Sequence, residues 1–136
     1  MASVLYVVNN TTQTVAANGT IALGTTVHRN CQSQARVNGN AINIVGAGYF
    51  TIDVSATFTA ATTGDVTIQL YQDGVAVQGA TATGTVATAS TQIISVSFTS
   101  EILKQCNCNQ PLSLTLVNTG AEATYSNIAI RVKRDA

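Results

Sequence analysis

The chain has 136 residues, of which 46% are hydrophobic and only 9% are charged, and its six basic and six acidic residues leave no net charge. This length suits a single domain over residues 1–136 that can bury a core. The balanced charge is not that of a nucleic-acid-binding domain, and we interpret the one basic cluster, Arg131, Lys133 and Arg134, as a solvated tail. No stretch approaches the ~20 apolar residues of a membrane span. We therefore expect neither nucleic acid nor a membrane as a partner.

The scarcity of charge also bears on assembly. Soluble domains carry about 25% charged residues, and neutral, charge-poor proteins tend to associate. One interpretation is a soluble monomer whose surface consists of Thr, Ser, Asn and Gln. The other, which we favour, is that neighbouring subunits cover much of the surface.

The opening segment, MASVLYVVNN, lacks the basic stretch and apolar run of a secretion signal, so we expect synthesis in the cytoplasm without export. The short apolar run SVLYVV within it is a candidate strand. Residues 1–14 are therefore candidates for an N-terminal arm or an edge strand.

Alternating apolar and polar residues, the pattern of a half-buried strand, recur along the chain. The longest run follows Gly48, with Phe50, Ile52, Val54, Ala56 and Phe58 on one face and Tyr49, Thr51, Asp53, Ser55, Thr57 and Thr59 on the other. Shorter runs occupy residues 42–44, 66–71, 94–99, 112–116 and 128–132. No window shows an apolar period of 3.6 residues, so helices are not expected.

Turn signals separate these runs. The strongest is Asp73-Gly74, because a type I′ hairpin needs positive φ at both central residues. Pro111 stands immediately before a run, where its missing N–H does no harm. The other signals are Asn18-Gly19, Asn38-Gly39, Thr63-Gly64 and Thr119-Gly120. Eight to ten short strands in one domain predict a β-sandwich or jelly roll.

Residues 78–91, QGATATGTVATAST, consist almost entirely of small side chains. They fit a mobile loop, and they equally fit a strand that another chain approaches closely. Both interpretations stay open.

Little in the sequence suggests chemistry. His28 is the only histidine and no nucleophile motif lies near it, which favours a polar residue on a strand edge over a catalytic base. The acidic residues are scattered and form no calcium-loop spacing. We expect no enzyme activity, no catalytic residue and no cofactor.

The three cysteines are the ambiguous feature. Cys106 and Cys108 point to the same side if extended, and Cys31 is distant in sequence. Free thiols in a reduced cytosol are one interpretation. A disulfide between Cys31 and one of the pair is another. The third is a cluster across a trimer axis, where Cys106 and Cys108 would cross-link or bind a soft metal such as zinc.

Four segments, taken in order, resemble the tumour-necrosis-factor-like and complement-globular-head-like jelly rolls. They are GYFTIDVSATF (48–58), DVTIQLYQDGVAV (65–77), IISVSF (93–98) and LSLTLVNTGAEATYSNIAIRVKR (112–134). More narrowly, they are similar to small proteins of bacteriophages and prophages. Those proteins share an Asn-Gly or Asp-Gly hairpin and a Cys-rich link before "L-T-L-V-N-T-G", here CNCNQ (106–110).

This resemblance implies a compact homotrimer with a structural role in a virion, as a capsid decoration protein, head fibre or fibre tip. We therefore expect an all-β jelly-roll sandwich of eight to ten strands that forms a homotrimer. Its function would be that of a non-enzymatic protein on the virion surface, bound to the major capsid protein or another virion protein. The alternative is a trimeric recognition module that binds a host glycan or receptor through residues 78–91. The trimer interface is expected to include Tyr49, Thr51, Ile93, Ser95 and Tyr125.

Overall fold

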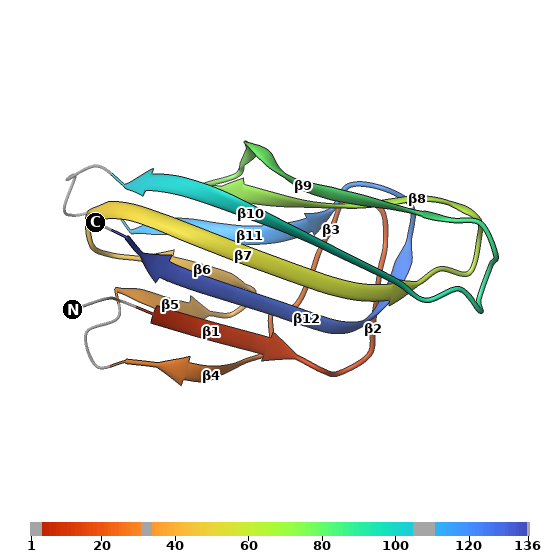
Figure 1. The fold of residues 1–136 in the computed structure, drawn as a ribbon, viewed down its shortest axis with the longest axis horizontal. Helices are drawn as coiled ribbons and strands as arrows, with labels where there is room; N and C mark the ends of the chain where they lie inside the picture. The colour runs from red at the N-terminus through yellow and green to blue at the C-terminus, as the bar shows by residue number, and fades with distance from the viewer. Residues whose placement is uncertain (1–3, 31–33, 105–110, 136) are drawn as a thin grey trace.

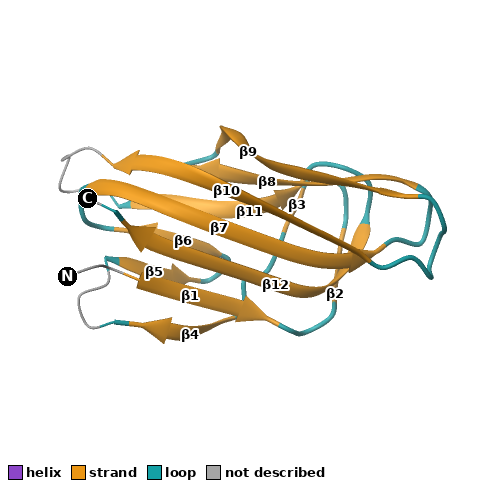
Figure 2. Ribbon diagram, in the orientation of Figure 1, coloured by secondary structure: helices purple, strands orange, loops and turns teal. Residues whose placement is uncertain are grey.

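The computed structural model describes residues 4–30, 34–104 and 111–135. Figures 1 and 2 show that the described residues form strands joined by turns and loops. The strands are β1 (Val4–Asn9), β2 (Gln13–Val15), β3 (Gly19–Thr20), β4 (Thr25–Arg29), β5 (Ala35–Asn38), β6 (Ala41–Ile44), β7 (Gly48–Thr59), β8 (Gly64–Gln72), β9 (Val75–Val86), β10 (Ile94–Lys104), β11 (Leu112–Asn118) and β12 (Ala123–Arg134). No helix that could cross a membrane occurs among these residues.

The strands form two antiparallel sheets that pack face to face, which confirms the predicted sandwich. Sheet A has the order β10-β7-β12-β1-β4, with β2 paired to β12 (Figure 1). Sheet B has the order β5-β6-β11-β8-β9, with β3 paired to β11. The twelve described strands exceed the expected eight to ten because β2 and β3, of three and two residues, are too short to show alternation.

The predicted alternation is confirmed on the longest run, β7. Its inward side chains, from Phe50 to Phe58, are all buried, while the residues between them are half-buried or exposed. Strand β11 shows the same period, with Leu112, Leu114 and Leu116 buried. Each Å² of apolar surface that is removed from water contributes about 25 cal/mol to the free energy of folding. The inward faces of these strands are therefore the main source of stability.

The turn at Asp73-Gly74 is as predicted. Its φ angles are 51° and 85°, the two positive values of a type I′ hairpin, between the paired residues Gln72 and Val75. The Asp73 carboxylate also accepts a hydrogen bond from the Ser113 N–H at 2.9 Å, and the Asp73 N–H donates to the Ser113 carbonyl at 2.8 Å. The turn that joins β8 to β9 is thus fixed to the neighbouring strand β11.

A buried asparagine at the end of β11 connects three segments of the chain by hydrogen bonds. Asn118 is fully buried, and its amide donates to the carbonyls of Val15 at 3.1 Å and Ala121 at 2.8 Å. Its side-chain oxygen accepts from the Gly120 N–H at 3.2 Å. Because buried polar groups must find partners, this amide fixes the β11–β12 connection against the end of β2.

The N-terminal residues lie within a sheet. β1 is hydrogen-bonded on both sides, to β12 and to β4, so residues 4–9 form neither a free arm nor an edge. The edge of sheet A on this side is β4, whose five residues are all exposed.

Most of the small-residue stretch 78–91 is strand. Residues 78–86 belong to β9, and only residues 87–91 lie in a loop. At Gly84 the need for a small residue comes from packing within this chain and not from a second chain. A Cβ added there would lie 2.7 Å from Ile94 Cγ2, 3.0 Å from Phe58 Cζ and 3.1 Å from Val96 Cγ1. The mobile-loop interpretation is therefore wrong for residues 78–86, and a small side chain there lets β9 close over β10.

We expect Gly84→Val to lower the free energy of unfolding by about 1–3 kcal/mol, because the added methyl groups overpack the contact with Ile94 and Phe58. Urea denaturation at a fixed protein concentration measures this. Ala76→Val, at an exposed position of the same strand, is the matched control and should change the stability by less than about 0.5 kcal/mol. Equal unfolding midpoints for both variants would contradict this packing.

Candidate functional site

The outer face of sheet A is a regular surface formed by neighbouring long strands. It is formed by the side chains of β10, β7, β12 and β1 that alternate with the buried ones. They are Ser95, Ser97, Thr99, Glu101 and Leu103 on β10; Tyr49, Thr51, Asp53, Ser55 and Thr57 on β7; Asn127, Ala129, Arg131 and Lys133 on β12; and Val4, Tyr6 and Val8 on β1. Most are small and uncharged, so the surface is flat and only weakly polar.

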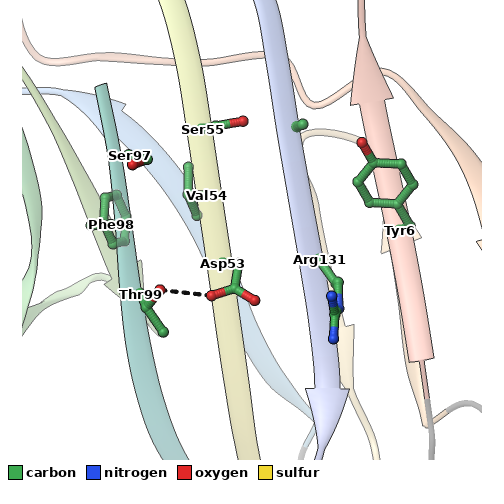
Figure 3. A pocket seen from close by; sticks show the side chains of 9 residues that line it. Tyr6, Asp53, Val54, Ser55, Ser97, Phe98, Thr99 and Arg131 are labelled. Atoms are coloured by element: carbon green, nitrogen blue, oxygen red, sulfur yellow. Dashed lines mark hydrogen bonds between the residues drawn. The ribbon is translucent and has the colours of Figure 1, made fainter. Parts of the chain in front are cut away.

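One row of larger polar side chains crosses this face from edge to edge. The strand registers place Thr99 opposite Asp53, Asp53 opposite Arg131, Arg131 opposite Tyr6, and Tyr6 opposite His28 on β4. Thr99 Oγ1 donates to Asp53 Oδ1 at 2.7 Å (Figure 3). The Tyr6 and His28 rings stack, with centroids 6.3 Å apart and planes 20° apart.

Beside this row lies an open depression of about 350 Å³. Its floor includes a neighbouring row of small residues, in which Ser97 is opposite Ser55 and Ser55 is opposite Ala129. Asp53 and Arg131 are the charged residues among the described ones that line it, and their side chains lie on adjacent strands in Figure 3. The depression exists because small side chains adjoin large ones on an otherwise flat sheet.

A second feature is the side of the sandwich where both sheets end, at β9 and β10. Apolar side chains of these strands face inward but are only partly covered; they are Val77, Ala82, Ile94, Val96 and Phe98. Strand β9 carries no charge over its twelve residues. We call this the β9–β10 side.

Three structural comparisons bear on the fold. Murine APRIL matches with a TM-score of 0.74 and 14% identity, over 98% of this chain and 99% of that chain. Eiger TNF from S. frugiperda matches with a TM-score of 0.72 and 8% identity, over 100% of this chain and 92% of that chain. PRD1 vertex protein P5 matches with a TM-score of 0.53 and 17% identity, over 98% and 96%.

The chain has the tumour-necrosis-factor-like jelly-roll fold. This confirms the fold expected from the sequence resemblance. At identities of 8–17% the likeness concerns the fold alone. No protein-family model and no curated protein matches the sequence.

Within this jelly roll, four of the five expected interface residues reach the surface. Tyr49 is 46% exposed and Ile93 is 71% exposed, Ser95 is exposed, and Thr51 is half-buried and donates a hydrogen bond to the Asp135 carboxylate. Tyr49, Thr51 and Ser95 lie on the outer face of sheet A, whereas Ile93 lies just before β10.

Tyr125 is a wrong prediction, because its side chain is fully buried and packs edge-on against Phe58 at a centroid distance of 5.6 Å. The alternation of Ile128, Ile130 and Val132, continued back along the strand in steps of two, would put Tyr125 on the outer face. A β-bulge between Tyr125 and Asn127 inserts one residue into β12, which reverses the alternation and turns Tyr125 inward.

The residues considered for chemistry do not converge in the described part of the jelly roll. His28 lies exposed on the edge strand β4, as the sequence predicted. No group of three His, Cys, Asp or Glu side chains suited to a metal occurs among the described residues. Cys31, Cys106 and Cys108 lie outside the described residues, so the three interpretations (free thiols, a disulfide or a cluster across a trimer axis) stay open.

Tyr125 gives a sharp test of the core at the bulge. Its hydroxyl has no hydrogen-bond partner among the described residues, and burial raises the pKa of its phenol well above the ordinary value. Because an unpaired buried hydroxyl is destabilising, Tyr125→Phe should raise the free energy of unfolding by about 1 kcal/mol. Tyr125→Ala should lower it by about 3–5 kcal/mol.

Thermal and urea unfolding of both Tyr125 variants check these signs. Tyr71→Phe, at a half-buried tyrosine of β8, is the control and should give no comparable gain. A loss of stability in Tyr125→Phe would mean that the hydroxyl is hydrogen-bonded in solution.

Proposed function

We propose that the chain is a non-enzymatic structural protein that assembles as a homotrimer on the surface of a phage particle. The observation that carries the proposal is that one chain has two surfaces suited to contact with another copy. The outer face of sheet A is flat and poor in charge, and the β9–β10 side leaves apolar side chains half covered.

The β9–β10 side has an edge strand and partly exposed apolar side chains that favour contact with a second chain. Proteins protect long edge strands with prolines, charges or bulges, since an unprotected edge pairs with other chains. Strand β10 has eleven residues, contains no proline, and pairs with β7 without any register shift, and its two charged residues, Glu101 and Lys104, both lie near its C-terminal end. Its inward side chains Ile94, Val96 and Phe98 remain partly exposed. A second chain that covers this side would complete their burial.

A second copy of the same chain supplies a suitable cover. Packing the β9–β10 side of one copy on the outer face of sheet A of the next is a head-to-tail contact, which closes into a ring after a fixed rotation. The tumour-necrosis-factor-like fold and the sequence resemblance favour three copies per ring. An obligate assembly of this kind buries over ~2,000 Å² at each interface.

Two observations favour a virion. The sequence segments that carry the resemblance are similar to those of small phage proteins, and PRD1 vertex protein P5 has a related fold. A trimer matches sites of three-fold symmetry on a capsid lattice, where repeated contacts add avidity. The partner would be the major capsid protein or another virion protein.

A recognition module is the second candidate, favoured by the ordered loop between β9 and β10. Gln92 Oε1 accepts hydrogen bonds from the N–H groups of Ala87 at 2.7 Å and Thr88 at 3.0 Å. The Ser90 N–H donates to the Ala60 carbonyl at 2.7 Å. The loop lies at the end of the sandwich opposite the start of β1 (Figure 1), where it would be free to meet a host glycan or receptor.

We expect wild-type protein to have the mass of three chains, and Ser55→Arg to shift it towards monomers. Ser55 lies on β7 in the outer face of sheet A, on the floor of the depression, so in the proposed trimer an arginine there would be buried without a partner. Such a charge costs several kcal/mol, or a dissociation constant raised about 30-fold or more. Analytical ultracentrifugation over a concentration series measures this.

Thr115→Arg is the matched control, because Thr115 faces outward on β11, the central strand of sheet B. It should stay trimeric. A wild-type protein that is monomeric at every concentration, or equal behaviour of the two variants, would refute the proposed assembly.

We further expect the trimer to co-sediment with particles of the phage that encodes it. Ser55→Arg should bind about 100-fold more weakly because a monomer loses avidity. Absence of wild-type binding to particles, together with binding to host cells or a glycan array that fails when residues 87–91 are replaced, would favour the recognition module instead.

A further inference from the structure

The few charges on the outer face of sheet A are sorted by strand. The acidic residues within the strands of this face, Asp53 and Glu101, lie on β7 and β10, which form the half of the face next to the β9–β10 side. A further carboxylate, that of Asp135 just after β12, accepts a hydrogen bond from Thr51 of β7. Both basic residues, Arg131 and Lys133, lie on β12, at the centre of the sheet. The face is therefore acidic at one edge and basic in the middle.

These charges form no ion pair with one another among the described residues. Among residues 4–30, 34–104 and 111–135, the Arg131 guanidinium has no acceptor within hydrogen-bonding distance, although Asp53 is opposite it in the register. Asp53 instead accepts from Thr99. Glu101 likewise has no side-chain partner in the described residues; the Thr51 opposite it donates to Asp135.

We infer that Glu101 of one copy pairs with Arg131 of the next copy across the trimer interface. This inference rests on the proposed homotrimer and names the contact that sets its register. A head-to-tail contact lays the β10 edge of one copy on the neighbour's sheet A, which brings the acidic edge over the basic centre. The occupant of this face is thus a second copy, and the charge pattern is complementary to itself.

Arg131 is a better partner for Glu101 than Lys133 for a geometric reason. Arginine presents a planar fork that binds a carboxylate with two parallel hydrogen bonds, and this geometry matters most where water is excluded. Arg131 lies on the wall of the depression near the centre of the face, with its side chain exposed in the single chain. A two-fold pairing of this face with itself would satisfy the charges but leave the β9–β10 side uncovered.

A charge-exchange cycle tests the inference. Glu101→Arg and Arg131→Glu alone should each raise the dissociation constant of the trimer at least about tenfold, since each places like charges together. The double variant Glu101→Arg/Arg131→Glu restores opposite charges and should return to within about threefold of the wild type. Arg131→Lys keeps the charge but loses the two parallel hydrogen bonds of the guanidinium, so its dissociation constant should lie between those of the wild type and Arg131→Glu.

Sedimentation velocity over a concentration series gives these constants, and circular dichroism confirms that each variant is folded. Glu122→Arg, at an exposed residue between β11 and β12, is the control for an added basic charge away from the face and should match the wild type. The wild-type trimer should also dissociate more readily as salt rises, a readout that needs no variant.

The outcomes separate the two claims. A wild-type trimer in which the single exchanges have no effect, or in which the double variant is not rescued, overturns the ion pair and leaves the homotrimer standing. A wild-type protein that never exceeds the mass of one chain overturns both.

Discussion

The burial of alternate side chains of β7 between the two sheets is the constraint on which the rest of the structure depends. This strand contributes Phe50, Ile52, Val54, Ala56 and Phe58 to the core and is paired along its length with β10 and β12. Because side chains alternate between the two faces of a strand, each side chain that points into the core places the next residue on the outer face. The composition of the outer face of sheet A is therefore a direct consequence of how the core is filled.

In a sandwich of this kind the apolar side chains between the sheets are covered in the middle but less well covered at the sides, where the sheets end. On the β9–β10 side the two sheets end with small residues on β9, where Gly84 permits contact with Ile94 and Val96 across the gap. The same small side chains are too short to cover the inward face of β10 fully. Close approach of the sheets and an exposed apolar strip are thus two results of one sequence feature.

Much of the fold was predictable from the sequence because the signals are local. The alternation of β7 and β11 and the Asp73-Gly74 turn each lie within one continuous segment. The bulge in β12 was not predictable, because Ile128, Ile130 and Val132 alone give no sign that one residue is inserted after Tyr125. The strand β9 was left open for a similar reason, since residues such as Thr81, Ala82 and Gly84 show no apolar alternation.

The candidate surface depends on contacts between distant segments. Its row of polar side chains joins Tyr6, Asp53, Thr99 and Arg131, which only the strand registers bring together. The sequence therefore indicated that an uncharged outward face exists, through Thr51, Ser55 and Thr57, but not where its charges meet.

The arrangement of these charges matters because the rest of the face is nearly repetitive. Along β10 the outward side chains Ser95, Ser97 and Thr99 are similar in size and polarity. A partner that slipped by two residues along such a surface would lose little packing, which leaves the register weakly specified. Buried ion pairs add little net stability, but a single charged contact makes every other register leave a charge unpaired. In a surface of hydroxyl and methyl groups, a few charges are sufficient to select one arrangement.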